Sequence, residues 1–327
     1  MFMNSLIISM IISISSSNWM GMWMGMEINL LSIIPLMNSS KNSMPSESSL
    51  KYFITQAIAS TMILFSIMFS LKFAIEKTSL LFILLNSSLL IKMGAAPFHF
   101  WFPEVLEGLS WNNCMLMLTS QKITPMVLLM YNINFPKFIS LIIIISSVVS
   151  TFMSFNQISL RKMMAYSSIN HIAWMLSTML FTKSMWINYF IIYSVISINI
   201  IIMFKLFNVF FISQFISKMN DSPINKIFFS MNFMSLGGIP PFLGFMPKWM
   251  AIQTLILNKF YMITLILMIS SLIMLFVYMR ISFTSLILNF SEILIKSYKS
   301  KKMNIIMFMN FTSMNTLILV SLNFNLT

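Results

Sequence analysis

Long apolar runs with almost no charge constrain this chain more than any other feature of its sequence. The segment YMITLILMISSLIMLFVYM at 261–279, for example, contains no Asp, Glu, Lys or Arg. A membrane-spanning helix needs about 20 mostly apolar residues, and soluble chains carry roughly 25% charged residues. Here 58% of the 327 residues are hydrophobic and only 8% are charged. We therefore expect a single integral membrane domain over residues 1–327.

Charged points and Pro-, Gly- or Asn-rich points divide the sequence into about eleven segments of membrane length. The pattern predicts an all-α, polytopic bundle of transmembrane helices. The ninth segment is too long for one straight helix and contains its own breaker. The spans are expected near residues 1–17, 19–37, 52–73, 79–97, 111–132, 137–155, 160–182, 185–212, 225–256, 260–285 and 303–324.

The chain is strongly basic, with 20 Lys and Arg residues against 7 Asp and Glu. Most of these lysines lie in short loops beside apolar runs, where they set topology and meet anionic lipid headgroups. We expect lipids as partners and no nucleic acid. With an odd number of spans the loops form two sets, and the more basic set, with the N-terminus, is expected on the inner side. The first set has Lys41, Lys51, Arg161, Lys162, Lys218, Lys226, Lys296, Lys299, Lys301 and Lys302, and the second has Lys72, Lys77, Lys137, Lys183 and Lys259.

Cys114 is the only cysteine, so the sequence offers no disulfide framework, no paired-cysteine metal site and no iron-sulfur ligation. Hydrolase, nucleotide-binding and metalloprotease motifs are likewise missing from the sequence. We expect no cofactor or metal on this chain. With these reaction types excluded, the residues of the chain favour proton transfer.

An ionisable side chain near the bilayer centre costs about 2.5 to 3.5 kcal/mol and usually serves a function, and four residues meet this description best. Glu27 follows Gly21 and Gly25, a GxxxG pair that lets another helix approach closely. An alternative for Glu27 is a structural ion pair, and the lysines near helix breaks have the alternative of snorkelling to the interface. The candidate proton-transfer residues are Glu27, Lys92, Lys122 and Lys248, with His171 as a weaker fifth because a membrane histidine also serves as a structural hydrogen-bond partner.

Two helix breaks are expected beside two of these lysines. Pro240 and Pro241 have no amide proton, so the carbonyls one turn earlier lose their helical partners, and two glycines loosen the same turn. Gly94 and Pro97 predict a second break beside Lys92. Interrupted backbone at membrane depth is tolerated where protein or water satisfies it, as at transporter ion sites. The pattern indicates a pair of half-channels. A simple packing kink is the alternative.

Several stretches resemble the chain 2 family of mitochondrial NADH:ubiquinone oxidoreductase (complex I), an antiporter-like membrane subunit. They are GMEINLLSIIP at 25–35, KYFITQA at 51–57, IKMGAAPFHFWFPEV at 91–105, QKITP at 121–125, LRKMMAYSSINHIAWM at 160–175 and SLGGIPPFLGFMPKW at 235–249. The resemblance implies an antiporter-like fold that is shortened at its N-terminus relative to bacterial counterparts. It also implies a location in the mitochondrial inner membrane with the N-terminus in the matrix.

The resemblance further implies roles for the buried charges. Glu27 and Lys92 resemble the family's input pair, Lys122 its central lysine, and Lys248 the lysine of the second broken helix. His171 matches less closely, and Lys205 matches no family motif. NADH, flavin, iron-sulfur clusters and ubiquinone are then expected on other subunits, and neighbouring antiporter-like subunits are expected as partners. A freestanding cation/proton antiporter and a non-pumping membrane scaffold remain alternatives.

Overall fold

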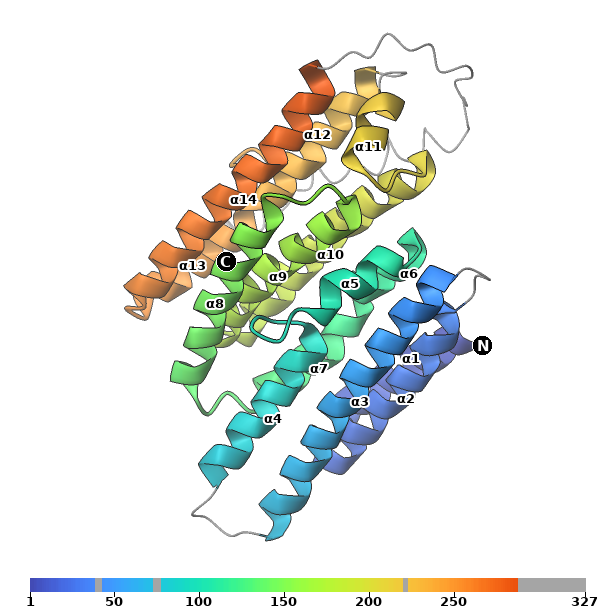
Figure 1. Cartoon of the computed structure of the whole chain (residues 1–327). Coiled ribbons are helices and arrows are strands. Elements are labelled where there is room, and N and C mark those ends of the chain that lie inside the picture. The colour runs from blue at the N-terminus through green and yellow to red at the C-terminus, as the bar shows by residue number, and fades with distance from the viewer. Residues whose placement is uncertain (39–42, 73–77, 220–222, 288–327) are drawn as a thin grey trace. The chain divides into compact units, whose positions relative to one another are not determined.

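The computed structural model describes residues 1–38, 43–72, 78–219 and 223–287 (Figure 1). These residues form helices joined by turns, and their one β-bridge pairs Ser159 with Phe211. The predicted all-α class is thereby confirmed for the described residues. Contacts divide the chain into two compact units, Met1–Ser146 and Ser147–Thr327. The expectation of one membrane domain stays a prediction.

The first unit contains seven complete helices among its described residues. Helix α1 packs along α2, α2 along α3, and α3 along α4 (Figure 1). The predicted close approach at the GxxxG pair is confirmed, because a Cβ atom added to Gly25 would lie 2.7 Å from the Cβ of Ser13 on α1. The helices are α1 (Phe2–Ser15), α2 (Trp19–Met37), α3 (Ser43–Lys72), α4 (Thr78–Met93), α5 (Trp101–Gly108), α6 (Trp111–Leu118) and α7 (Ser120–Met130), and α8 (Pro136–Ser154) runs from this unit into the next.

The described part of the second unit is built around α9, which is buried along nearly its whole length. Helices α10, α13 and α14 all pack against α9, and α12 packs against α10 and α14. The elements are α9 (Leu160–Met179), α10 (Lys183–Phe207), α11 (Ile212–Met219), α12 (Pro223–Gly237), α13 (Phe245–Leu257) and α14 (Tyr261–Ile287).

Five helices of the described residues are long and apolar enough to cross a membrane, and two shorter helices are apolar. The eleventh expected span, at 303–324, lies outside the described residues. The full count of about eleven spans therefore stays a prediction. The five long segments are Trp19–Met37, Ser43–Ser70, Pro136–Ser154, Lys183–Phe207 and Tyr261–Leu286, and the two shorter ones are Phe2–Ser15 and Leu80–Met93.

The predicted break near Gly94 is confirmed. Helix α4 ends at Met93, and Gly94 has a φ of +74°, a conformation that favours glycine. The carbonyl of Ile91 accepts the amide of Gly94 and the indole N–H of Trp101, each at 3.1 Å. The chain then continues as the short helix α5, which lies between two of the expected spans. Protein donors thus satisfy the interrupted backbone at this break.

The predicted break in the ninth span is also confirmed. Helix α12 ends at Gly237, an irregular turn follows, and α13 begins at Phe245. Gly238 has a φ of +81°, and its amide donates to the carbonyls of Met234 and Ser235. A Cβ atom added to Gly244 would overlap the carbonyl of Ser235, so the turn folds back tightly onto the end of α12.

A third irregularity, between α6 and α7, was not predicted. Thr119 has φ −115° and ψ −79°, which separates the two helices within the expected span 111–132. The hydroxyls of Thr119 and Ser120 donate to the carbonyls of Met115 and Leu116, at 2.7 and 2.9 Å. Such side-chain bonds compete with the helical ladder and bend helices. The bend lies within one turn of Lys122.

Candidate proton-transfer site

Lys122 is the most deeply buried charged residue in the part of the chain that the structure describes. It lies in the first turn of α7 with 1% of its surface exposed. Its ammonium nitrogen lies 5.3 Å from the centre of the Phe102 ring on α5, within the range of a cation–π contact. The sequence-based prediction of a central lysine agrees with this position. Its proton-transfer role stays a prediction.

Lys92 lies in the last turn of α4, immediately before the first helix break. It lines a small cavity of about 20 Å³ together with side chains from α2, α3 and α7. A cavity of roughly 10–15 Å³ is enough for one water molecule. Six of the nine lining residues are polar or charged: Asn29, Tyr52, Gln56, Lys92, Gln121 and Thr124.

Glu27 lies in the middle of α2, and one of its carboxylate oxygens is buried. It is the acidic residue that interacts electrostatically with Lys92. Among the described residues, the two side chains form no ion pair within 4.0 Å. The structure therefore places the expected input pair in the same unit, at a separation longer than a salt bridge.

A hydrogen-bonded chain of neutral side chains joins three helices around this cavity. The Tyr52 hydroxyl donates to the Gln121 side-chain oxygen at 3.1 Å, and the Gln121 side-chain nitrogen donates to the Asn29 side-chain oxygen at 2.9 Å. Tyr52 and Asn29 are 3% and 4% exposed. Gln121 directly precedes Lys122, so this chain reaches the turn of α7 that carries the central lysine. No feature of the sequence indicated this hydrogen-bonded chain, because none of the three residues is ionised.

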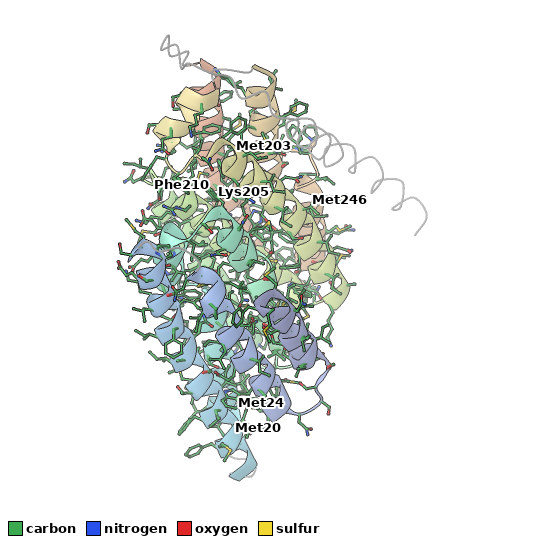
Figure 2. The ribbon with its side chains drawn as sticks, turned by 90° about the vertical axis from the view of Figure 1, so that its right-hand side faces the viewer. Met20, Met24, Met203, Lys205, Phe210 and Met246 are labelled. Carbon is green, nitrogen blue, oxygen red and sulfur yellow. The ribbon has the colours of Figure 1, made fainter. Side chains whose placement is uncertain are left out.

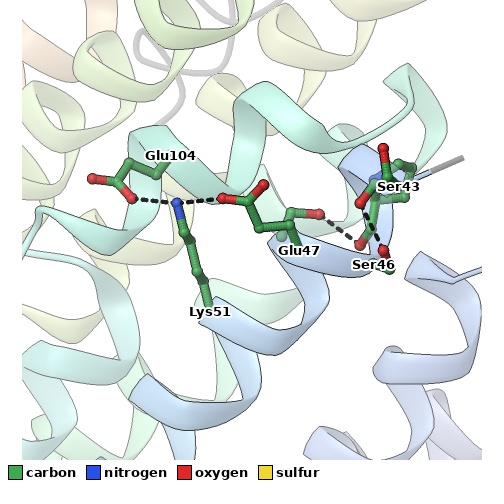
Figure 3. Close-up of polar contacts among 7 residues, drawn as sticks. Ser43, Ser46, Glu47, Lys51 and Glu104 are labelled. Atoms are coloured by element: carbon green, nitrogen blue, oxygen red, sulfur yellow. Dashed lines mark hydrogen bonds and ion pairs between the residues drawn. The ribbon is translucent and has the colours of Figure 1, made fainter.

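At the surface of the same unit, Lys51 lies between two carboxylates (Figure 3). Its ammonium is 3.0 Å from Glu47, one turn earlier on α3, and 2.9 Å from Glu104 on α5. All three side chains are exposed, so the network contributes little to stability. It does connect the short helix after the first break to the start of α3.

Lys248 lies at the start of α13, directly after the second break, and is 6% exposed. Its ammonium donates to the carbonyl of Gly237, the last residue of α12, at 2.7 Å. That carbonyl is one of those expected to lose a helical partner. A Cβ atom added to Gly238 would lie 2.9 Å from the Cδ of Lys248, so a larger residue there would require the lysine side chain to shift.

His171 lies in the buried middle of α9, and its Nδ1 is 3.0 Å from the Tyr189 hydroxyl on α10. The Tyr193 ring lies beside it, with ring centroids 4.9 Å apart. These three residues line a cavity of about 10 Å³ with Gly244 and Pro247 at the second break. The structure therefore brings His171 to the same break as Lys248.

Three further ionisable residues have simpler environments. Lys205 is exposed near the end of α10 (Figure 2), so the chain itself gives no burial that would support a role in transfer. Glu104 is exposed, as expected of an interfacial residue. His99 is 3% exposed in the turn between α4 and α5. Within the described ranges no group of three or more His, Cys, Asp or Glu residues could hold a metal ion.

Comparisons with known proteins agree on the family. Residues 16–274 match the membrane family described as NADH:quinone oxidoreductase/Mrp antiporter. The chain is 44% identical over 306 residues to NADH-ubiquinone oxidoreductase chain 2 of Anopheles gambiae, covering 90% of this chain and 89% of the relative. It is 35% identical over 268 residues to the same chain of Ovis aries, covering 79% and 77%.

A solved structure shares the fold. A chain of respiratory complex I from Thermus thermophilus superposes with a TM-score of 0.86 at 19% identity, covering 96% of this chain and 76% of that one. The antiporter-like fold expected from the sequence is therefore confirmed.

Proposed function

Because the chain belongs to the NADH-ubiquinone oxidoreductase chain 2 family, we propose that it is a core membrane subunit of respiratory complex I that contributes a pair of proton half-channels. The observation that carries this proposal is the recurrence of one arrangement in both units. Each unit has a helical segment interrupted beside a lysine, Lys92 at Gly94 and Lys248 at Gly238. Broken helices of this kind form the ion sites of transporters.

The proposed carriers in the first unit are Glu27, Lys92 and Lys122. Burial disfavours the protonated form of a lysine, whereas a nearby carboxylate favours it. A change in the distance between Glu27 and Lys92 therefore alters whether Lys92 holds its proton. Lys122 faces the apolar ring of Phe102. It is the next proposed carrier after Lys92 in the order of proton transfer. In the second unit, Lys248 is the proposed carrier and His171 an additional one.

The energy for transfer comes from elsewhere in the complex. Moving one charge across the membrane costs about 2.3 kcal/mol per 100 mV. In this proposal, subunits that carry NADH, flavin, iron-sulfur clusters and ubiquinone supply that energy, and neighbouring membrane subunits contact this chain. The proposed location is the mitochondrial inner membrane, with about eleven spans and the N-terminus in the matrix.

A native gel tests the assignment directly. Solubilised mitochondrial membranes should show this chain co-migrating with NADH dehydrogenase activity in a large assembly. Migration as a single chain, apart from that activity, would support a freestanding antiporter instead. A complex that contains the chain and still pumps normally after loss of Lys92, Lys122 and Lys248 would identify it as a scaffold.

A further inference from the structure

The cavity beside Lys92 has a buried donor that the chain's own described residues do not satisfy. Gln56 is 4% exposed and lines the cavity, and its side-chain nitrogen has no hydrogen-bond partner among the residues that the structure describes. Leaving such a donor unsatisfied costs about 1–3 kcal/mol. Buried polar groups of this kind are normally paired with protein or with ordered water.

The cavity also has the size and the lining that a water molecule requires. Its volume of about 20 Å³ exceeds the roughly 10–15 Å³ that one water needs. A buried water typically makes about three hydrogen bonds. The Gln56 amide and the Lys92 ammonium supply donors here, and the side-chain oxygens of Asn29, Tyr52 and Gln121 supply acceptors.

We propose that this cavity binds one water molecule between Lys92 and the Tyr52–Gln121–Asn29 chain, and that Gln56 and Gln121 are positioning residues that hold it. This inference rests on the proposed proton-transfer function and names the next group along its path. The proton that leaves Lys92 passes to the water oxygen, and the amine nitrogen keeps the bonding electron pair. The hydronium ion so formed passes a proton on to the neutral amine of Lys122, the next proposed carrier. The amides do not take up the transferred proton; they fix the position of the water through hydrogen bonds.

Neighbouring hydrogen bonds already fix the side chains around the water. The Tyr52 hydroxyl proton points to Gln121, so the Tyr52 oxygen presents its lone pairs to the cavity. The Gln121 nitrogen is committed to Asn29. The wall is therefore preorganised, and the water that it holds lies at the turn of α7 that also carries Lys122.

A high-resolution structure of the intact complex provides the first test. The density should show an ordered water about 3 Å from the Gln56 side-chain nitrogen and within hydrogen-bond reach of Lys92. A dry cavity, or one closed by a rotated Gln56 side chain, would refute the site.

Substitution of Gln56 provides the second test. Gln56→Leu keeps a side chain of similar volume but removes the amide, and Gln56→Asn keeps an amide in the same wall. We expect Gln56→Leu to lower proton pumping coupled to NADH oxidation by about three- to tenfold. Its solvent deuterium isotope effect should change, complex levels should be normal, and Gln56→Asn should restore most of the activity. The matched control is Gln253→Leu, an exposed glutamine on α13, which should leave pumping unchanged.

The two proposals fail in different ways. If Lys92→Met abolishes coupled pumping while Gln56→Leu pumps normally, the water site is wrong and the carrier role of Lys92 stands. If Lys92→Met also pumps normally, the proposed function of this region is wrong, and the water density still decides whether the site exists. Loss of assembled complex in Gln56→Leu but not in Gln56→Asn, with an unchanged isotope effect in the remaining complex, would reduce Gln56 to a structural role.

Discussion

At the residue scale, burial distinguishes Lys122 and Lys248 from Lys205, but not from Lys226, which the sequence placed in a loop and which is also 6% exposed. Lys122 and Lys248 are 1% and 6% exposed, whereas Lys205 is exposed on the chain. The positions of the first two follow from the sequence, because each lies inside an apolar run. The contacts that these side chains and their neighbours make could not be predicted from the sequence. Tyr52 and Gln121 are 69 residues apart, and no local pattern predicts that a tyrosine on one helix meets a glutamine on another.

Lys122→Met is expected to lower coupled proton pumping strongly while leaving assembly largely intact. Methionine matches the length of lysine and removes the charge together with its desolvation cost, and its thioether packs favourably against the Phe102 ring. Pumping in reconstituted vesicles and complex levels on native gels measure the two effects. A structural lysine would behave in the opposite way, because breaking a buried pair costs about 3–5 kcal/mol and assembly would fail first. Normal pumping at normal complex levels would exclude the carrier role.

At the element scale, the two main breaks could be predicted because proline and glycine act through the backbone. Pro240 and Pro241 cannot donate, and Gly94 and Gly238 both adopt a positive φ that other residues rarely occupy. The bend at Thr119 could not be predicted in the same way. It depends on hydroxyls that bond to carbonyls of their own helix, and many serines and threonines here do so within uninterrupted helices.

Gly238→Ala is expected to reduce the amount of assembled complex, whereas Gly237→Ala should have little effect. Gly238 combines φ +81° with contacts to the Lys248 stem as short as 2.9 Å, while a Cβ on Gly237 meets only side chains at 3.4 Å or more. The positive φ alone costs alanine about 1–2 kcal/mol. Complex levels and heat inactivation of NADH:ubiquinone activity, compared between the two variants, measure the difference. Equal behaviour of the two would show that the break tolerates a side chain.

At the scale of the whole molecule, each of the two compact units contains a helical segment that is interrupted beside a lysine. Composition was enough to predict a membrane bundle, since a chain with 8% charged residues has no means of covering a soluble surface. The division into units depends on long-range contacts and was not visible in the sequence. The orientation of the bundle rests on loop charge alone.

Protease protection in mitoplasts tests that orientation. Residues 291–302, which lie outside the described residues, carry Lys296, Lys299, Lys301 and Lys302 and are expected on the matrix side with the N-terminus. Cleavage there should require disruption of the inner membrane. Cleavage in intact mitoplasts, where protease reaches only the intermembrane-space face, would invert the proposed topology.

At the second break, a hydrogen bond from the Lys248 ammonium to the Gly237 carbonyl connects the two half-helices, and its donor is an ionisable group. In an ordinary helix a backbone amide, which keeps its proton, would occupy the place that this ammonium takes. A charged donor forms a hydrogen bond roughly twice as strong as a neutral one, so departure of one proton weakens the link between the end of α12 and the start of α13. If Lys248 carries a proton as proposed, loss of that proton is expected to weaken the contact between the two half-helices.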